Sequence, residues 1–391
     1  MRSNSFGHVE FSMTKKTIVY FVTEDWYFCS HRLSLAVAAR NAGFIVYVVT
    51  RVFSHGDEIR AAGLKLVPVE LSRRSKNPAT ELALIRELTR IYKRLEPDIV
   101  HHVALKPVIY GSIAARLANV PHVVNAMAGL GYLYASNNAT ARLARPLVKT
   151  LMRVLLNNTR TRVILQNPDD VALMTDSGTI RPERITLIRG SGVDPDVFRS
   201  VPELPGSQTV MLASRLLWDK GVGEFVEAAE ILRAEGYEAR FVLVGDGDDA
   251  NPASIDAATL DAWKRDGSVE FWGRRNDMPD VLARAHVVCL PSYREGVPKV
   301  LIEAASCGRA IVTTDAPGCR EIVRHGVNGL LVPIRDAAAL ADAIRTLLDD
   351  PALRARMGKA GREIVKKEFT VEAVVEATLD VYENLLQGGS Q

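Results

Sequence analysis

The sequence predicts an α/β protein built from two doubly wound parallel sheets. Its 391 residues exceed the length over which one hydrophobic core keeps growing, so two domains are expected. Short apolar runs of strand length alternate with helical patterns along the whole chain. This alternation pauses at a Pro- and Gly-containing segment, 203–207, and then begins again. We therefore expect domains at 14–203 and 204–372, a C-terminal helix at 373–391 that returns to the first domain, and a disordered extension at 1–13.

The composition is that of a soluble globular protein. Hydrophobic residues make up 47% of the chain and charged residues 24%. No apolar run approaches the roughly 18–20 residues of a membrane-spanning helix, and residues 1–16 lack the apolar core of a signal peptide. The four cysteines form no C-x-x-C pair or disulfide ladder, which favours a reducing compartment. These observations predict a cytoplasmic protein.

The net charge of +3 conceals an asymmetry between the two halves. Residues 1–200 hold 27 Lys and Arg against 16 Asp and Glu, whereas the remainder holds 22 against 30. No acidic residue occurs between Asp98 and Asp169, a stretch with eight basic ones. A basic half implies an anionic partner. Because the chain has no nucleic-acid motif, we expect a membrane surface or a phosphorylated acceptor and no nucleic acid.

The first half contains a series of apolar runs that read as buried parallel strands. Helical patterns at 31–41 and 79–95 separate some of them. The expected strands lie at 17–22, 44–50, 98–103, 121–125, 163–167 and 184–188.

Ligands of a doubly wound sheet bind beyond the carboxyl ends of its strands. In the first half this rule selects the segments 23–31, 101–106 and 128–131. His102 and Lys106 follow one strand, where the lysine could neutralise a phosphate and the histidine could bond a sugar hydroxyl or the reacting oxygen. A histidine satisfied inside the fold and a solvated lysine explain the pair equally well.

A basic helical pattern follows at 141–156. Its cations share one face and Leu and Val cover the rest, as in helices that lie on a membrane surface. A packed helix with a solvated basic stripe is an equally good interpretation. The cations are Arg142, Arg145, Lys149 and Arg153.

The second half opens with a strand at 210–213 that leads into Ser214–Gly221, followed by a helix at 222–235. Arg215 and Lys220 stand five residues apart after this strand, a spacing that could clamp a diphosphate. The next strand runs from 241 into a turn with Gly245 and Gly247, where backbone can approach a ligand. Further strands are expected at 269–273, 287–290 and 310–315.

The segment Tyr293–Ala304 carries two glutamates eight positions apart, Glu295 and Glu303. Pro298 suits a helix start and the apolar residues after it repeat at helical spacing, so Glu295 precedes a helix and Glu303 lies inside it. A helix N-terminus attracts phosphate, and carboxylates accept hydrogen bonds from hydroxyls. The segment therefore suggests a sugar nucleotide, although solvated glutamates are common and are the alternative.

Taken in order, the second-half motifs resemble glycosyltransferase family four, whose members are retaining, metal-independent enzymes of GT-B fold. The motifs are Ser-Arg-Leu-x3-Lys-Gly, Gly-Asp-Gly, Phe-Trp-Gly, Glu-Gly-x6-Glu, Pro-Gly-Cys-Arg-Glu and Asn-Gly-Leu-Leu-Val. The resemblance covers nearly the whole chain from about Lys16. The segments 28–32, 106–107 and 129–131 look like the subgroup that adds hexose or N-acetylhexosamine to lipid-linked precursors. The implied fold has two Rossmann-like domains facing across a cleft.

The resemblance implies roles for the donor-binding residues. Arg215 and Lys220 would hold the donor diphosphate and stabilise it as it leaves. Glu303 would accept hydrogen bonds from the ribose hydroxyls, and Glu295 would meet hydroxyls of the transferred sugar. The other implied donor positions are Gly296 and Val297 near the distal phosphate, Gly245 and Gly247 at the glycine turn, and Arg274 and Arg275 beside the base.

The same resemblance places Glu295, His102 and Lys106 beside the reaction, with His31 as the alternative histidine. Retention would follow from departure and attack on one face of the sugar, the leaving phosphate taking the acceptor proton. Glu295 would then position the sugar and would not attack it, unlike the carboxylate pair of glycosidases. The implied acceptor and membrane positions are Gly129, Gly131, Arg142, Arg145, Lys149 and Arg153.

No metal and no cofactor is implied. Asp194-Pro195-Asp196 imitates a D-x-D metal motif but lies in a conventional segment of this family, so we interpret it as structural. The first loop, 23–27, lacks the glycine pair of many members, which argues against a phosphate contact there.

The predicted function is transfer of a hexose or N-acetylhexosamine from a UDP-sugar to a polyprenyl-diphosphate-linked acceptor by an enzyme on the inner face of the cell membrane. A UDP-sugar 2-epimerase of the same architecture and a non-catalytic scaffold are the alternatives. The sequence makes no prediction of the oligomeric state.

Overall fold

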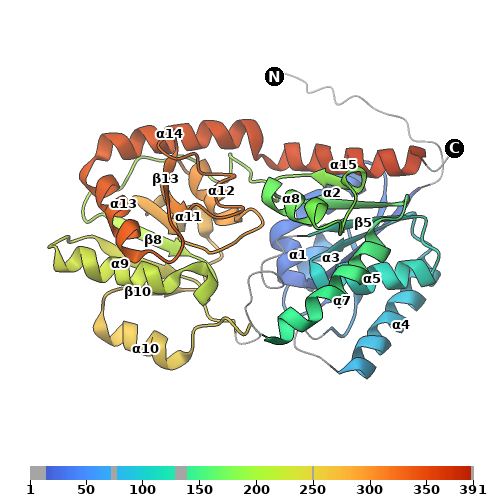
Figure 1. Ribbon diagram of the computed structural model, residues 1–391. Coiled ribbons are helices and arrows are strands. Elements are labelled where there is room, and N and C mark those ends of the chain that lie inside the picture. The colour runs from blue at the N-terminus through green and yellow to red at the C-terminus, as the bar shows by residue number, and fades with distance from the viewer. Residues whose placement is uncertain (1–14, 72–76, 128–138, 249–250, 389–391) are drawn as a thin grey trace, which may run out of the picture. The chain divides into compact units, whose positions relative to one another are not determined.

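We describe a computed structural model of the chain, which defines residues 15–71, 77–127, 139–248 and 251–388 (Figure 1). The chain divides into two compact units, residues 1–125 with 381–391 and residues 126–380. The extension expected at 1–13 lies outside the described residues, and the domain boundary expected at 203–204 stays a prediction.

The first sheet has seven strands in the order β3-β2-β1-β4-β5-β6-β7. β1 lies at its centre and pairs in parallel with β2 on one side and β4 on the other. Every residue of β4 is buried, as expected for a central parallel strand. The strands are β1 (Thr17–Glu24), β2 (Ile45–Arg51), β3 (Lys65–Pro68), β4 (Ile99–Val103), β5 (His122–Ala126), β6 (Thr161–Leu165) and β7 (Ile185–Leu187).

Helices connect these strands. The helix expected at 31–41 is observed at Leu33–Asn41, and it begins two residues later because the backbone of Arg32 leaves the helical region at φ −133° and ψ −11°. A shorter helix before it, Asp25–His31, was not predicted. Two of the helices begin at an Asn-Pro pair whose asparagine side chain caps the first turn. The helices are α1 (Asp25–His31), α2 (Leu33–Asn41), α3 (Gly56–Ala61), α4 (Pro78–Leu95), α5 (Leu105–Leu117), α7 (Ala139–Leu156) and α8 (Pro168–Asp176).

The second sheet has six strands in the order β10-β9-β8-β11-β12-β13, with parallel pairings throughout. The chain order reverses between β8 and β11, which is the place where doubly wound sheets bind ligands. The five strands predicted in this half agree with the observed ones to within two residues, and the sixth, β13, was not predicted. The strands are β8 (Thr209–Ala213), β9 (Arg240–Val244), β10 (Glu270–Gly273), β11 (Val287–Leu290), β12 (Ala310–Thr314) and β13 (Gly329–Val332).

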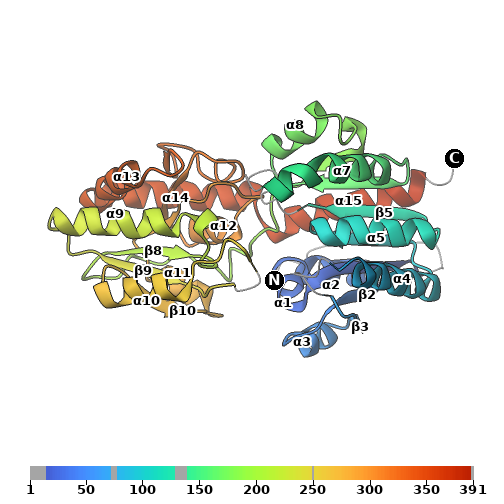
Figure 2. The ribbon, with the colours of Figure 1, turned by 60° about the horizontal axis from the view of Figure 1, so that its bottom comes forward.

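Helices cover both faces of the second sheet, as Figures 1 and 2 show from two directions. α9 (Val222–Ala234) and α13 (Ala337–Asp349) share one apolar cluster with the sheet. α11 (Met278–Ala283), α12 (Lys299–Ser306) and α14 (Pro351–Glu368) share the cluster on the other face. α10 (Ala257–Asp266) and α15 (Val371–Gly388) complete the chain. This two-sheet architecture confirms the predicted fold class.

A buried polar cluster lies in the core of the first unit. The Tyr382 hydroxyl, from the last part of α15, lies 2.8 Å from the Tyr20 hydroxyl and 2.5 Å from Nδ1 of His101. Burial raises the pKa values of both tyrosines, so both hydroxyls stay protonated. Among the described residues, no helix is both long and apolar enough to cross a membrane.

Candidate active site

Two loops meet at the carboxyl ends of β8 and β11. The first carries Lys220 at the end of a short 3-10 turn, Trp218–Lys220, and the second leads from β11 to α12. Gly221, which follows Lys220, has φ 71°, and a Cβ there would lie 2.2 Å from the carbonyl oxygen of Pro291. Only glycine allows this approach, which brings Lys220 against the loop that carries Glu295.

Glu295 lies on the loop before α12, as predicted. One of its carboxylate oxygens accepts hydrogen bonds from Nζ of Lys220 and, at 2.8 Å, from Oγ of Ser292. The Lys220 and Glu295 side chains are 17% and 12% exposed, so the ion pair is largely removed from water. Burial raises the pKa of the adjacent Asp219, an effect that the charge of Lys220 opposes. Lys220 and Arg215 therefore both offset the negative charge of Asp219 and Glu295.

The turn after β9 lies directly beside the loop that carries Lys220. Gly245 has φ 131°, and a Cβ there would lie 1.9 Å from the carbonyl oxygen of Ser214. Arg215 is half-exposed and its guanidinium donates to a carboxylate oxygen of Asp248 at 2.6 Å. The predicted turn thus packs Gly245 against the backbone of Ser214, and the next residue, Asp246, accepts from the backbone N–H of Leu216 at 2.9 Å.

Glu303 lies within α12 and is buried. Burial raises the pKa of its carboxyl, which the Lys299 ammonium group, 3.4 Å away, partly counters. α12 begins after Pro298, whose extended backbone (φ −71°, ψ 115°) occupies the N-cap position. The predicted placement of the two glutamates, one before the helix and one inside it, is confirmed.

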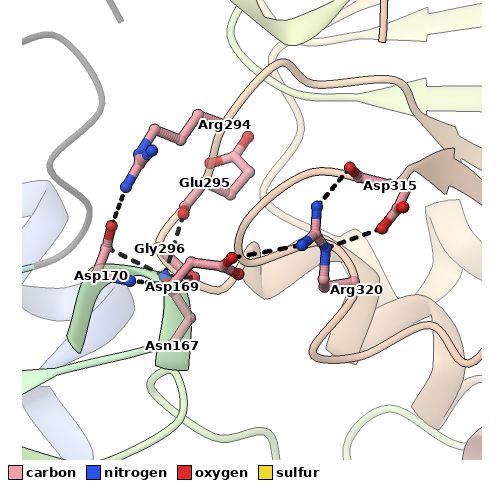
Figure 3. Close-up of polar contacts among 8 residues, drawn as sticks. All are labelled: Asn167, Asp169, Asp170, Arg294, Glu295, Gly296, Asp315 and Arg320. Atoms are coloured by element: carbon pink, nitrogen blue, oxygen red, sulfur yellow. Dashed lines mark hydrogen bonds and ion pairs between the residues drawn. The ribbon is translucent and has the colours of Figure 1, made fainter. Parts of the chain in front are cut away.

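A set of residues that was not predicted from the sequence holds the loop of Glu295 in place. Asn167 and Asp170, at the start of α8, face the segment of Arg294, Glu295 and Gly296 (Figure 3). Nδ2 of Asn167 donates to the carbonyl oxygen of Gly296 at 2.8 Å, and Arg294 forms an ion pair with Asp170, which is fully buried. The only sequence signal was an Asn-Pro-Asp-Asp helix start, which is indistinguishable from an ordinary cap.

Two further ion pairs extend this contact. Arg320 donates to Asp315 at 2.8 Å and approaches Asp169, beside Asp170, at 3.4 Å (Figure 3). These groups are partly exposed, so their contribution to stability is small.

The structure places His102 in the core of the first unit. Its side chain is fully buried, Nδ1 lies 2.8 Å from Oδ1 of Asn125, and Nε2 lies 3.2 Å from the hydroxyl of Tyr92. Burial lowers the pKa of His102 to about 4, so the ring is neutral at physiological pH. Both ring nitrogens are thus partnered within the fold. This geometry favours the structural interpretation of His102 over the catalytic one.

The other predicted groups of the first unit lie nearer the surface. Nζ of Lys106 donates to Oε1 of Glu81 at 2.8 Å and lies 5.4 Å from the ring centre of Tyr110. His31, half-buried at the end of α1, stacks on Tyr27 with ring centres 4.2 Å apart. His31 therefore lies at the far end of α1, the helix that follows the central strand β1.

Asp25 is the first residue of α1 and lies within the segment 23–27, where a loop was expected. Its buried carboxylate accepts hydrogen bonds from the backbone N–H groups of Phe53, Ser54 and His55 at 2.7–2.8 Å. Burial would raise the pKa of Asp25, but these bonds hold it below its usual value. Where a loop was expected at 23–27, the strand β1 thus passes directly into α1 at a structural carboxylate.

The basic pattern at 141–156 forms α7, whose bounds agree with the prediction to within two residues. Along its described part, Arg153 is exposed, Lys149 is half-buried, and Leu147 and Val154 are 73% and 58% exposed. α7 therefore presents apolar side chains beside its cations. The side chains of Arg142 and Arg145, and Gly129 and Gly131 altogether, lie outside the described residues.

Arg274 and Arg275 follow β10. Arg274 is exposed, and Nε of Arg275 donates to Asp277 at 2.8 Å. Asp194, in the segment that imitates a metal motif, uses one carboxylate oxygen to accept from the backbone N–H of Asp196 at 2.8 Å, as in a turn.

Comparison with known proteins decides the family. Residues 207–350 match the family described as "Glycosyl transferases group 1", and residues 17–167 match "Glycosyl transferase 4-like". The chain is a glycosyltransferase. It is 28% identical over 370 residues to the N,N'-diacetylbacillosaminyl-diphospho-undecaprenol α-1,3-N-acetylgalactosaminyltransferase of Campylobacter jejuni. The aligned region covers 91% of this chain and 95% of that protein.

Other glycosyltransferases are similar over most of their length. The chain is 28% identical over 315 residues to the UDP-Gal:α-D-GlcNAc-diphosphoundecaprenol α-1,3-galactosyltransferase of Escherichia coli, covering 76% of this glycosyltransferase and 79% of that one. Among solved structures, HepE of Anabaena has a TM-score of 0.76 at 20% identity and covers 94% of this glycosyltransferase and 99% of HepE. Sucrose-phosphate synthase of Thermosynechococcus elongatus has a TM-score of 0.80 at 21% sequence identity, and the match covers 96% of this glycosyltransferase and 100% of the synthase. The GT-B fold is thereby confirmed, and the 2-epimerase alternative gains no support.

Proposed function

We propose that this glycosyltransferase moves a hexose or N-acetylhexosamine from a UDP-sugar to a sugar carried on a polyprenyl diphosphate. The two relatives described above support the acceptor class, because both are named for substrates linked to undecaprenyl diphosphate and both match most of the chain. The name of the E. coli relative also supports UDP as the donor nucleotide.

The observation that carries the proposal is the pairing of Lys220 with Glu295 at the carboxyl ends of β8 and β11. A donor diphosphate arriving there would exchange one anionic partner of Lys220 for another. The ammonium group would then stabilise the charge that develops on the leaving phosphate, with Arg215 released from Asp248 as a second cation. Glu295, freed from Lys220, would accept hydrogen bonds from hydroxyls of the transferred sugar.

Glu303 suits the nucleoside. A buried carboxyl inside a helix is costly to ionise, and hydrogen bonds from vicinal hydroxyls lower that cost. We assign it to the ribose hydroxyls. Arg274, which is exposed, and Arg275, which is held by Asp277, would border the base from the end of β10.

The transfer is proposed to retain the anomeric configuration without a metal ion and without a protein nucleophile. The bond from the anomeric carbon to the distal phosphate oxygen breaks, the acceptor oxygen bonds to the same face of that carbon, and its proton passes to the leaving phosphate. Glu295 would keep its hydrogen bond from Ser292 after Lys220 turns to the diphosphate, and it would orient the sugar without attacking it. Binding and electrostatic stabilisation would supply the acceleration.

The acceptor is assigned to the first sheet. His31 replaces His102 as the histidine beside the reaction, because His102 is enclosed in the core. Lys106 would reach an acceptor phosphate by exchanging its partner Glu81 for that anion.

α7 would attach the enzyme to the inner face of the membrane. A helix with exposed Leu147 and Val154 beside Lys149 and Arg153 can bury its apolar side chains among lipids and pair its cations with anionic head groups.

The test is a panel of UDP-sugars, assayed for UDP release with and without a polyprenyl-diphosphate-linked monosaccharide. We expect one or two donors to release UDP only when the acceptor is present. Interconversion of UDP-sugars without acceptor would indicate an epimerase. Absence of UDP-sugar binding would indicate a non-catalytic scaffold.

A further inference from the structure

The loop that carries Glu295 presents two backbone carbonyls to one side. Nδ2 of Asn167 donates to the carbonyl oxygen of Gly296 at 2.8 Å and approaches that of Glu295 at 3.4 Å. From a separate loop, Gly318 packs on the same two atoms: a Cβ there would lie 2.3 Å from the oxygen of Gly296 and 2.6 Å from that of Glu295. Both carbonyls therefore face Asn167 and Gly318.

The opposite side of these peptide units follows from their geometry. In a trans peptide the N–H points away from the C=O of the same unit. The two N–H groups are those of Gly296 and Val297, so both point away from Asn167. Among the described residues, neither N–H has a hydrogen-bond partner. Two consecutive free N–H groups in front of a helix form an anion-binding arrangement.

Asn167 is itself held in place. Its Oδ1 accepts from the N–H of Asp170 at 2.7 Å, which caps α8, and its Nδ2 lies 3.1 Å from a carboxylate oxygen of Asp170. The buried carboxylate of Asp170 also pairs with Arg294, the residue before Glu295. The start of α8 thus holds the loop through the ion pair with Arg294 and through the carbonyl oxygens of Glu295 and Gly296 (Figure 3).

We propose that Asn167 is a positioning residue for the donor: by holding the carbonyls of Glu295 and Gly296, it aims the N–H groups of Gly296 and Val297 at the distal phosphate. The inference rests on the proposed function, because it takes a nucleoside diphosphate as the ligand. It adds to that function Asn167, which lies 128 positions before Glu295 in the sequence and caps a helix with no predicted donor role.

The test separates this contact from helix capping. Asn167→Ser keeps a capping oxygen but is too short to reach the loop, and Asn167→Asp keeps the shape and the cap but turns a carboxylate oxygen toward two carbonyls. Asn77→Ser is the matched control, since Asn77 also caps a helix before a proline, accepting from the N–H of Ala79 at 3.0 Å.

The readout is the affinity for UDP relative to UMP, measured by calorimetry. UMP lacks the distal phosphate. If the N–H groups of Gly296 and Val297 are no longer directed at that phosphate in Asn167→Ser, the affinity for UDP should fall about fivefold to tenfold, as expected for one or two lost hydrogen bonds, and the affinity for UMP should stay unchanged. Asn167→Asp should lose more, and Asn77→Ser should keep the wild-type ratio. General unfolding of a variant would lower the affinity for UDP and for UMP together.

An unchanged ratio of UDP to UMP affinity in both Asn167 variants would overturn the inference alone. A wild-type enzyme that binds UDP no better than UMP would overturn the proposed donor site, and the inference with it. Should Asn167→Ser not fold, Asn167→Asp gives the same reading, because it preserves the cap of α8.

Discussion

Replacement of Lys220 by alanine is the perturbation with the largest predicted effect. The side chain donates to Glu295, and among residues 15–71, 77–127, 139–248 and 251–388 it is the one cation that does so, in a pair that is only 17% and 12% exposed. Removing a single preorganised donor to a leaving oxygen typically lowers kcat by about 100-fold to 1,000-fold. We expect a loss of that order in UDP release by Lys220→Ala.

The same substitution has a predictable effect on stability. Glu295 would keep the hydrogen bond from Ser292 but lose its cation while remaining nearly buried. The free energy of unfolding should fall by about 2 kcal/mol, the usual order for a buried charged group left without its partner. Adding Glu295→Gln to Lys220→Ala removes that unpaired charge, so the double variant should regain stability but not turnover.

The assay is steady-state UDP release with saturating acceptor, alongside thermal unfolding of each variant. Lys366→Ala is the control, because Lys366 forms a surface pair with Glu363 at 3.5 Å in which both side chains are about half-exposed. It should retain wild-type turnover and stability. Wild-type turnover in Lys220→Ala would refute the reasoning. So would a double variant that recovers activity together with stability, because the defect would then be one of folding.

Three further predictions test separate parts of the structure. Gly245→Ala should cost more than about 1 kcal/mol of stability and most donor affinity, because φ is 131° and the new Cβ would overlap the carbonyl oxygen of Ser214; denaturant unfolding and UDP calorimetry measure both. The pKa of His102 is lowered from 6.5 to about 4 in the folded protein, so the folded state binds fewer protons than the unfolded state between these pH values. The free energy of unfolding should therefore fall by about 3 kcal/mol as the pH falls from 6.5 to 4. A folded His102→Gln variant with the same pH dependence would contradict this. Changing Lys149 and Arg153 together to glutamine should weaken binding to anionic vesicles about thirtyfold, at about 1 kcal/mol for each cation, and unchanged sedimentation with vesicles would count against α7 as the membrane contact.

Local sequence patterns determined the strands and the donor loops well. The apolar runs predicted the central strands because parallel strands are buried on both faces. Pro298 and the periodic residues after it placed Glu295 before α12 and Glu303 within it, as observed. These predictions succeeded because each depended on residues adjacent in the chain.

What the sequence left open or did not indicate concerns contacts between distant segments. The pattern His102-x3-Lys106 has one appearance whether the histidine faces solvent or core, and only the packing of Tyr92 and Asn125 shows that it is enclosed. Asn167 caps a helix like many asparagines, and its bond to Gly296 spans 129 positions. Burial and tertiary hydrogen bonds of this kind are set by the fold and leave no local periodic signal.

The most direct measurement of the central claim follows the sugar itself. Purified enzyme is incubated with a radiolabelled UDP-sugar and a polyprenyl-diphosphate-linked monosaccharide, and the lipid is extracted into organic solvent. The account predicts that label moves into the lipid fraction with wild-type enzyme and that Lys220→Ala transfers it at least about 100-fold more slowly. Label that stays in the aqueous phase for every donor tested, or that moves equally fast with Lys220→Ala, would contradict it.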